Sequence, residues 1–188
     1  MNPPVLTTAR LKLRQLTDAD AAFLVRLLND PAFIANIGDR GVRDEADARA
    51  YLATGPRASY HKHGFGLYRV ERDDGTPIGI CGLLKRENLE LPDIGYALLP
   101  EHRGSGYARE AAVAVLGEAR DRFRLVEICA VVSPGNAPSI ALLEALGFVF
   151  DSEIAWGDPA TPTLLYRRTQ RKPNSSGSTA TTNAAHKA

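Results

Sequence analysis

The sequence predicts an α+β sandwich, in which helices cover both faces of a mixed, mostly antiparallel central sheet. Short apolar or alternating runs flank an Asp-Asp-Gly turn at residues 73–75 and indicate a β-hairpin. Other segments repeat their apolar side chains with the 3.6-residue period of a helix. The two kinds of segment are interleaved along most of the 188 residues, a length that suits a single domain with one substantial core.

The N-terminal part is expected to contain one strand and two helices. Residues 10–14 alternate between charged and apolar side chains, which is typical of a half-buried strand. Thr17 is a candidate cap of the first helix. The apolar side of this helix consists of Phe23, Leu24, Leu27 and Leu28. Pro31 and Gly38 indicate a turn, and a short amphipathic helix is predicted over about residues 44–54.

The remaining segments are predicted to form strands and two more helices. The first of these helices extends to Phe123 and begins with alanines, whose small side chains allow close packing on a sheet. The second begins at Asn136 and ends at Gly147, because glycine suits the left-handed position that follows a helix. The predicted strands cover residues 66–71, 78–85, 91–99, 126–132, 148–154 and 163–168.

Composition limits the organisation and the partners of the chain. Residues 1–170 are expected to form the single domain, and residues 171–188 a disordered tail, because the tail has no side chain that could anchor a core. The net charge of +1 predicts no strong attraction to nucleic acid or to an anionic membrane. No apolar run approaches the roughly 20 residues of a membrane-spanning helix, and the first residues lack a signal-peptide pattern. We therefore expect a cytoplasmic protein.

The two cysteines of the chain, Cys81 and Cys129, both lie in apolar, strand-like runs. We expect reduced thiols in the core, rather than a disulfide or a covalent nucleophile, which would need an exposed and electropositive setting. The sequence has no Cys-x-x-Cys or His-x-x-x-His pattern, so no metal site is predicted. Monomer and homodimer both remain open.

The most informative segment is the glycine turn at residues 103–106, which follows a predicted strand and opens a helix. Its glycines allow a tight turn whose amides converge on an anion, and the helix adds unpaired N–H groups and its positive dipole end. This pattern predicts a diphosphate site; the alternative is a glycine turn before an ordinary helix. A Walker A loop is excluded because its lysine is missing, and a dinucleotide fingerprint because Arg109 stands where a small residue is needed.

Two blocks of the sequence resemble the GNAT N-acetyltransferases. Residues 103–108 (Arg-x-x-Gly-x-Ala) are similar to the acetyl-CoA pyrophosphate loop of that superfamily, and residues 136–148 (Asn-x-x-Ser-x-x-x-x-Glu-x-x-Gly-Phe) to a second block. The second block is especially similar to the RimJ/RimL branch, which acetylates the N-termini of ribosomal proteins. The resemblance covers about residues 7–168 and implies a GNAT-like sheet, acetyl-CoA as co-substrate, and direct transfer to a primary amine in a ternary complex.

The resemblance also implies which groups bind acetyl-CoA. The pantetheine arm would lie beside the strand at Ala97, Leu98 and Leu99, where an unpaired N–H would bind the oxyanion of the tetrahedral intermediate. Asn136 would contact the same arm, cap its helix, or do both. The diphosphate would be held by the backbone of Arg103, Gly104, Ser105, Gly106, Tyr107 and Ala108.

Two residues are predicted to take part in catalysis. Many GNAT enzymes protonate the leaving thiolate with a tyrosine whose position is occupied here by Leu143, whereas the RimJ/RimL branch has a serine that corresponds to Ser139. The Ser139 hydroxyl would bind the thiol sulfur, or would only satisfy N–H groups of its own helical turn. Asp93 lies before the strand that flanks the acetyl group in the family. It would act as a base through water, or would be an ordinary solvated residue.

The amine that accepts the acetyl group must be neutral when it attacks. At pH 7, deprotonation costs about 4.6 kcal/mol for a lysine side chain and about 1.1 kcal/mol for an α-amine. A site without a strong base therefore favours an α-amine over a lysine side chain. The acceptor is either a protein or peptide N-terminus, which the resemblance to the RimJ/RimL branch favours, or a small amine such as a polyamine, amino acid or aminoglycoside. His102, at the mouth of the loop, is a further candidate base. His61 and His63 are predicted in a surface loop that could also line the acceptor site.

Two further alternatives remain open at the level of the sequence. One concerns four carboxylates that form either an acidic patch for a cationic acceptor or a solvated helix face, namely Asp39, Asp44, Glu45 and Asp47. The other is a non-catalytic sensor that binds acyl-CoA, which the missing tyrosine favours. Only an enzyme would release free thiol when an amine is added.

Overall fold

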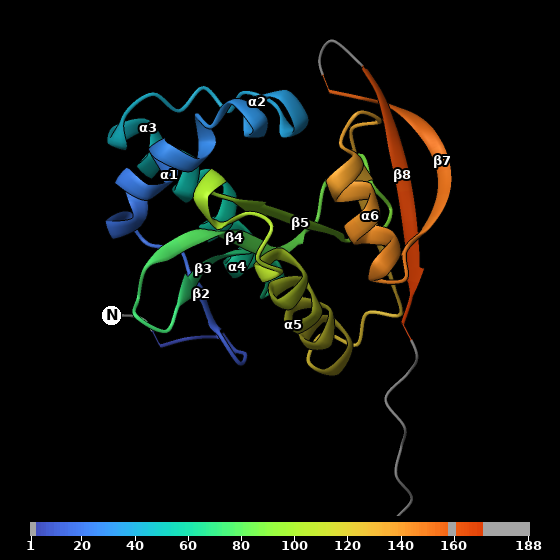
Figure 1. Ribbon diagram of the computed structural model, residues 1–188, viewed down its shortest axis with the longest axis horizontal. Helices are drawn as coiled ribbons and strands as arrows, with labels where there is room; N and C mark the ends of the chain where they lie inside the picture. The colour runs from blue at the N-terminus through green and yellow to red at the C-terminus, as the bar shows by residue number, and fades with distance from the viewer. Residues whose placement is uncertain (1–2, 158–160, 171–188) are drawn as a thin grey trace, which may run out of the picture.

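The computed structural model describes residues 3–157 and 161–170. Within these residues, one eight-stranded sheet runs through the molecule in the order β1-β2-β3-β4-β5-β6-β8-β7. All neighbouring strands are antiparallel except β5 and β6, which are parallel. Helices lie on both sides of the sheet (Figure 1), so the predicted α+β sandwich with a mixed, mostly antiparallel sheet is confirmed.

Seven of the eight strands in the described residues match predicted runs to within a few residues. The exception is β1, which is too short to show a period in the sequence. The predicted hairpin joins β3 to β4, and Gly75 in its turn has a φ of 84°. The strands are β1 (Leu6–Thr7), β2 (Leu11–Gln15), β3 (Leu67–Arg72), β4 (Pro77–Leu84), β5 (Asp93–Leu98), β6 (Glu127–Val132), β7 (Val149–Trp156) and β8 (Thr161–Thr169).

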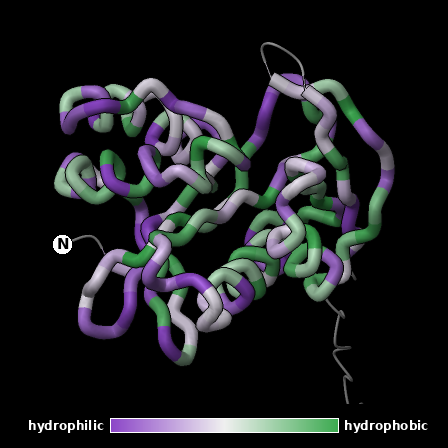
Figure 2. Tube along the Cα trace, turned by 45° about the horizontal axis from the view of Figure 1, so that its top comes forward, coloured by the Kyte–Doolittle hydropathy of each residue, from purple (hydrophilic) through white to green (hydrophobic). Residues whose placement is uncertain are grey.

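Two groups of helices cover the two faces of the sheet. Leu24 and Leu27 of α1 are fully buried on one face, and Ala111 and Val115 of α5 on the other, in two separate clusters of the core. Figure 2 shows that hydrophobic residues gather in the middle of the molecule. The helices are η1 (Asp18–Asp20), α1 (Ala21–Leu28), α2 (Pro31–Ile37), α3 (Glu45–Leu52), η2 (Ala53–Arg57), α4 (Ala58–His63), η3 (Pro100–His102), α5 (Tyr107–Asp121) and α6 (Ala137–Ala145).

The segment between Pro31 and Gly38 is helix α2, and the predicted turn is wrong. Proline is tolerated in the first helical turn, where its missing N–H would have no intrahelical acceptor in any case. Asp30 caps this helix by accepting a hydrogen bond from the amide of Phe33 at 3.1 Å. Gly38 ends it with a φ of 108°. Pro31 and Gly38 are therefore the start and stop signals of one short helix.

The helix predicted over about residues 44–54 starts at the expected place, because the Asp44 side chain caps α3. It then continues through η2 and α4 as far as His63. Pro56 lies in η2, a π-helical turn, where a wider hydrogen-bonding pattern accommodates a residue without an N–H donor. His61 and His63 thus belong to a helix, and the predicted surface loop is wrong.

None of the helices within residues 3–157 and 161–170 is long and apolar enough to span a membrane. Over the same ranges, no group of three or more histidine, cysteine, aspartate or glutamate side chains is arranged to hold a metal ion. The predicted tail, residues 171–188, lies outside the described residues.

Candidate active site

The parallel strands β5 and β6 separate soon after they meet. Their pairing consists of Asp93 and Cys129, next to a hydrogen bond from the Cys129 amide to the Pro92 carbonyl at 3.0 Å. Beyond this point, the described residues provide β5 with a partner strand on one side alone, which is β4. The sheet therefore contains a V-shaped opening that is closed at Asp93 and widens towards Leu98.

The backbone of β5 presents a donor to this opening. The Leu99 amide donates a hydrogen bond to the Ile78 carbonyl of β4 at 2.9 Å. Neighbouring residues of a strand direct their N–H groups to opposite sides, so the Leu98 amide points away from β4 and into the opening. Of the predicted stretch Ala97 to Leu99, Leu98 is thus the residue whose N–H can stabilise an oxyanion there.

The glycine turn between η3 and α5 follows directly after this part of β5. Gly104 and Gly106 have φ values of 76° and 78°, which other residues adopt only with strain. The amides of residues 104–109 have no hydrogen-bond acceptor within the described part of the chain. Consecutive free amides at the start of a 15-residue helix form a strong site for an anion.

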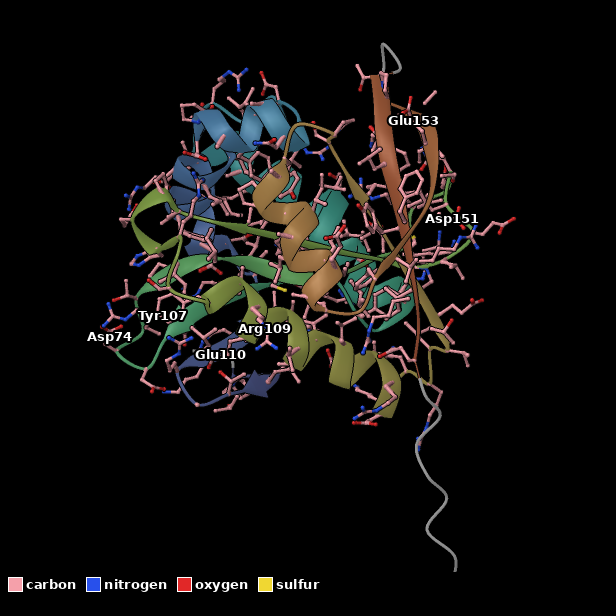
Figure 3. The ribbon with its side chains drawn as sticks, turned by 45° about the vertical axis from the view of Figure 1, so that its right-hand side comes forward. Asp74, Tyr107, Arg109, Glu110, Asp151 and Glu153 are labelled. Carbon is pink, nitrogen blue, oxygen red and sulfur yellow. The ribbon has the colours of Figure 1, made fainter. Side chains whose placement is uncertain are left out.

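The N-terminal segment of the chain braces this turn. Glu110 accepts hydrogen bonds from the Thr8 hydroxyl at 2.6 Å and from the Arg10 Nε at 2.6 Å. Arg10 also donates to the Ser105 carbonyl at 3.1 Å, and its guanidinium carbon lies 4.6 Å from the ring centroid of Tyr107. Figure 3 shows Tyr107 and Glu110 at the start of α5, beside the N-terminal strands. No motif or periodicity of the sequence indicates this long-range contact.

Two hydroxyl groups meet between β5 and α6. The Oγ of Ser139, in the first turn of α6, lies 2.9 Å from the hydroxyl oxygen of Tyr96 on β5. Burial raises the pKa of Tyr96 to about 12, against the opposing effect of the hydrogen bond with Ser139. Tyr96 therefore keeps its proton at neutral pH. Ser139 is thus a predicted site residue, whereas Tyr96 was not predicted.

A cavity of about 440 Å³ adjoins the same part of β5. Residues of α2, α3, η2 and α4 form one wall, and residues of β4 and β5, among them Gly95, Tyr96 and Ala97, form the other. This volume is sufficient for a small molecule or for a few residues of a peptide. Tyr96 contributes both to the cavity wall and to the hydroxyl pair, so the cavity and the V-shaped opening meet at this residue.

The sequence matches the family model described as acetyltransferase (GNAT) domain over residues 10–149. The chain belongs to the GNAT acetyltransferases. The sequence is also similar to the uncharacterized protein YkkB of Bacillus subtilis (strain 168). The two are 32% identical over 161 residues, which make up 82% of this chain and 91% of the relative.

Two solved GNAT structures are similar to the fold of this enzyme. An acetyltransferase from Agrobacterium tumefaciens (strain C58) has a TM-score of 0.76 at 30% identity, covering 90% of this chain and 96% of the other. RimL, a ribosomal L7/L12 α-N-protein acetyltransferase in complex with coenzyme A, has a TM-score of 0.75 at 15% identity, covering 88% and 97%. Because RimL is only 15% identical to this chain, its similarity concerns the fold alone. Acetyl-CoA is thus the donor expected for this GNAT site.

Arg103 differs from the rest of the GNAT loop in that both its amide and its side chain have partners within the chain. Its amide donates to the Pro100 carbonyl at 3.2 Å, in the last turn of η3, and is therefore not available to a diphosphate. Its guanidinium donates to the Leu98 carbonyl at 3.0 Å and pairs with Asp30, the cap of α2. Arg103 fastens the loop to β5 and to the first helical group, and the free amides begin one residue later.

Asp93 has a setting that the sequence did not predict. Its side chain is buried and accepts hydrogen bonds from the Arg86 Nε at 3.0 and 3.2 Å. Burial raises the pKa of Asp93, and the positive charge of Arg86 opposes this rise. Asp93 is therefore not a solvated surface residue, and it is absent from the cavity wall, to which Arg86 belongs.

The block at residues 136–148 has a structural role that the geometry explains. Asn136 caps α6, because its side chain accepts a hydrogen bond from the Ser139 amide at 3.3 Å. Leu143, in the place of the usual GNAT tyrosine, is buried in the core and faces no ligand site. The Ser139 hydroxyl is directed to Tyr96, not to the amides of its own turn.

The three histidines considered as site residues lie in different surroundings. His63 lines the cavity, and its ring centroid lies 5.6 Å from that of Phe65. His61, also on α4, is exposed and does not belong to the cavity wall. His102 lies in η3, with its Nε2 3.8 Å from the Glu101 carboxylate. Of the three, His63 is the one that the structure brings to the cavity.

The acidic patch considered for a cationic acceptor is wrong. Asp39 and Glu45 form ion pairs with arginines four residues further along the chain. Asp44 caps α3, and Asp47 accepts a hydrogen bond from the Arg43 amide at 2.8 Å. None of these four carboxylates belongs to the cavity wall. Their charges serve the local structure of the segment around α3.

The prediction of two reduced core thiols is confirmed. Cys81 and Cys129 are both free and buried. Burial raises the pKa of each thiol to about 12, and the nearby charge of Asp93 adds to the effect at Cys129. A thiol with such a pKa is almost entirely protonated at neutral pH and is a poor nucleophile.

Proposed function

We propose that this protein transfers the acetyl group of acetyl-CoA to the α-amine of a protein or peptide N-terminus, as enzymes of the RimJ/RimL type do. The observation that carries the proposal is the meeting of two sites at one stretch of β5. The V-shaped opening reaches Tyr96 and Leu98 from one side, and the 440 Å³ cavity reaches Tyr96 from the other. A thioester in the opening and an amine in the cavity would come together there.

The donor side of the site suits acetyl-CoA. The amides of residues 104–108 would hold the diphosphate, since they have no acceptor among the described residues. The pantetheine arm would lie in the opening, where its amide groups can bond to the unpaired edge of β5. Asn136 stands at the start of α6 beside the opening, and its backbone and side chain already hold the first turn in place.

The proposed reaction follows from the groups that surround the opening. The neutral amine attacks the thioester carbonyl carbon, forming the C–N bond, and the Leu98 amide stabilises the oxyanion. The C–S bond then breaks, and the departing thiolate takes a proton from the Ser139 hydroxyl. Tyr96 can donate a hydrogen bond to Ser139 and replace that proton, and the proton that the attacking nitrogen loses returns to Tyr96 through water. The buried, protonated thiols of Cys81 and Cys129 favour direct transfer in a ternary complex over an acyl-enzyme route.

Solvent is sufficient to remove the proton from an α-amine acceptor. At pH 7 this step costs only about 1.1 kcal/mol for a group with a pKa near 7.8. Asp93 was considered as a base through water, but its oxygens are buried against Arg86. We therefore assign Asp93 to the positioning of Arg86 in the cavity wall, and we assign the proton to water.

A screen of acceptors tests the proposal. Free thiol is measured after acetyl-CoA is mixed with N-terminal peptides, with polyamines, with amino acids, or with aminoglycosides. The proposal predicts the fastest thiol release with peptides. It also predicts that double-reciprocal plots of the initial rate against one substrate, at several concentrations of the other, give intersecting lines, which indicate a ternary complex. Faster release with a small amine would favour the small-molecule alternative. Binding of acetyl-CoA without thiol release in any mixture would favour a sensor.

A further inference from the structure

The acceptor cavity has an unusual balance of charge. Its wall includes the cationic side chains of Arg40, Lys62, Lys85 and Arg86, together with His63. No aspartate or glutamate is among the described residues that line it. The chain as a whole carries a net charge of +1, so this concentration of positive charge is local. A partly enclosed site whose side chains carry one sign of charge attracts ligands of the opposite charge.

Most of these cations are not neutralised by a carboxylate. Arg40 donates to the Ile37 carbonyl at 3.4 Å, and Lys85 donates to the carbonyls of Leu89 and Glu90. For Lys62 no ion pair is found with any residue in the described ranges. Carbonyl groups satisfy some of the donors but leave the positive charge in place.

Arg86 is the exception, and it is held in a fixed orientation. Its Nε donates to both oxygens of Asp93, and its guanidinium carbon lies 5.3 Å from the ring centroid of Trp156. Within the described part of the chain, its two terminal nitrogens have no hydrogen-bond acceptor. They form the planar, forked donor that binds a carboxylate with two hydrogen bonds.

The Tyr51 hydroxyl belongs to the same group of donors. Burial raises the pKa of Tyr51, and the positive charges of both Arg40 and Arg86 oppose this rise. Arg40 and Arg86 come from distant parts of the chain, and both line the cavity together with Tyr51. Two arginines and a tyrosine that keeps its proton thus belong to one cavity wall.

The position of this group relative to β5 limits the distance between the anion and the amine. Arg86 is fixed to Asp93, three residues before Tyr96, and a strand rises about 3.3 Å per residue. Measured along the strand, the anion would therefore lie roughly 10 Å from the Tyr96–Ser139 pair, beside which the thioester would lie. This is beyond the reach of the α-carboxylate of an amino acid. It matches an acidic side chain at the second or third residue of an extended peptide.

We propose that the preferred acceptor is a peptide N-terminus with aspartate or glutamate at its second or third position, whose carboxylate binds Arg86, Arg40 and Tyr51. This inference rests on the proposed acetyl transfer to an α-amine. It also explains why a buried aspartate is placed behind Arg86, where it orients the guanidinium towards the cavity. Polyamines, which carry only positive charge, are disfavoured in the same site.

The test compares peptides that differ at one side chain. Thiol release is measured for matched peptides with Asp, Asn or Lys at position 2, and with Glu, Gln or Lys at position 3. One charged hydrogen-bonded contact predicts a kcat/KM about 10- to 100-fold higher for the acidic peptide than for its amide counterpart. The lysine peptides are expected to be slower still. High salt should reduce the ratio.

Variants identify the residues responsible for this ratio. Arg86→Gln should bring the acidic-to-amide ratio close to one. Because this change also leaves Asp93 buried without its partner, Arg40→Gln and Lys62→Gln serve as second variants at exposed positions. Each should lower the ratio by a smaller factor. Arg120→Gln, an exposed arginine of α5 paired with Asp121, is the matched control and should leave the ratio unchanged.

The possible failures are distinguishable. Peptides that react with equal rates for acidic and amide side chains would overturn the acidic preference, while acetyl transfer to an α-amine would stand. Free aspartate or glutamate that reacts faster than every peptide would also overturn it, because the carboxylate would then belong to the amino acid itself. Thiol release with uncharged small amines and with no peptide would overturn the proposed function as well.

Discussion

The donor side and the acceptor side of this site are built in different ways. The proposed donor side consists of the backbone amides of residues 104–108 and of the unpaired edge of β5. The proposed acceptor side consists of side chains from α2 to α4, from the segment after β4, and from β5. A site made of backbone amides depends on chain conformation, whereas a site made of side chains depends on which residues the fold brings together.

The difference implies that the two sides tolerate change differently. Substitutions on the donor side matter when they alter the backbone, and most side chains there can vary. Substitutions on the acceptor side change charge and shape directly, so related enzymes can keep one donor and use different amines. We therefore expect the most severe effects from changes to the glycine turn, and graded effects from changes around the cavity.

The largest effect is expected for Gly106→Val. Gly106 has a φ of 78°, which a β-branched residue cannot adopt without strain. The substitution should abolish detectable acetyl-CoA binding in calorimetry while the protein stays folded. Gly117→Ala is the control, because Gly117 lies in the same helix with open space around it. Unchanged affinity in a folded Gly106→Val variant would exclude the turn as the diphosphate site.

Changes to the hydroxyl pair should affect turnover and not donor binding. Ser139→Ala is expected to lower kcat about 10- to 1,000-fold with little change in acetyl-CoA affinity, as for a proton donor that acts in the transition state. Tyr96→Phe should have an effect in the same direction, because it removes the partner of the Ser139 hydroxyl at 2.9 Å. If both variants keep full turnover, the hydroxyl pair has no catalytic role and only positions α6.

The same contrast explains what the sequence could predict. The positive φ values at Gly104 and Gly106 are local properties that the glycines themselves indicate, so the turn was found. The contact between Tyr96 and Ser139 joins residues 43 positions apart, and nothing in either segment specifies it before the topology is known. Arg103 is a residue type that the family pattern allows at this position. Its side chain nevertheless pairs with Asp30, the cap of a helix that was not predicted.

Among the secondary-structure elements, seven of the eight strands in the described residues were predicted well, and the short helices α2 and α4 were not. α2 has seven residues, too few to show a helical period, and its proline and glycine resemble turn signals. The cavity was not predictable, because its wall joins α2, α4 and β5. Its positive charge becomes visible only when Arg40 and Arg86 are seen to face one space.

The acceptor side can be tested with the pH dependence of the reaction. The amine must be neutral, so kcat/KM should rise with pH and level off near the pKa of an α-amine, about 7.8. Because the pKa of Tyr96 is about 12, Tyr96 keeps its proton over the pH range of the assay, and its deprotonation should cause no fall in kcat/KM there. On matched peptides at pH 7, an α-amine should react faster than a lysine side chain by up to about 3.5 kcal/mol in activation free energy. Equal rates would indicate a strong base near the cavity.

The smallest effect is expected at the C-terminus. Apart from Pro173, residues 173–188 offer no apolar side chain larger than alanine for packing, so their deletion should leave the melting temperature and the turnover number unchanged. Differential scanning calorimetry and the thiol assay on the shortened chain measure both. A clear fall in melting temperature would show that this segment contributes to one of the two sides.

The central claim is that the two sides together transfer an acetyl group to an α-amine. The most direct measurement is mass spectrometry of a peptide that carries both a free N-terminus and an internal lysine, after incubation with acetyl-CoA and the protein. We predict one acetyl group, located on the N-terminal nitrogen by fragmentation, and almost none on a peptide whose N-terminus is blocked. Acetylation of the lysine in the blocked peptide at a comparable rate would contradict the account.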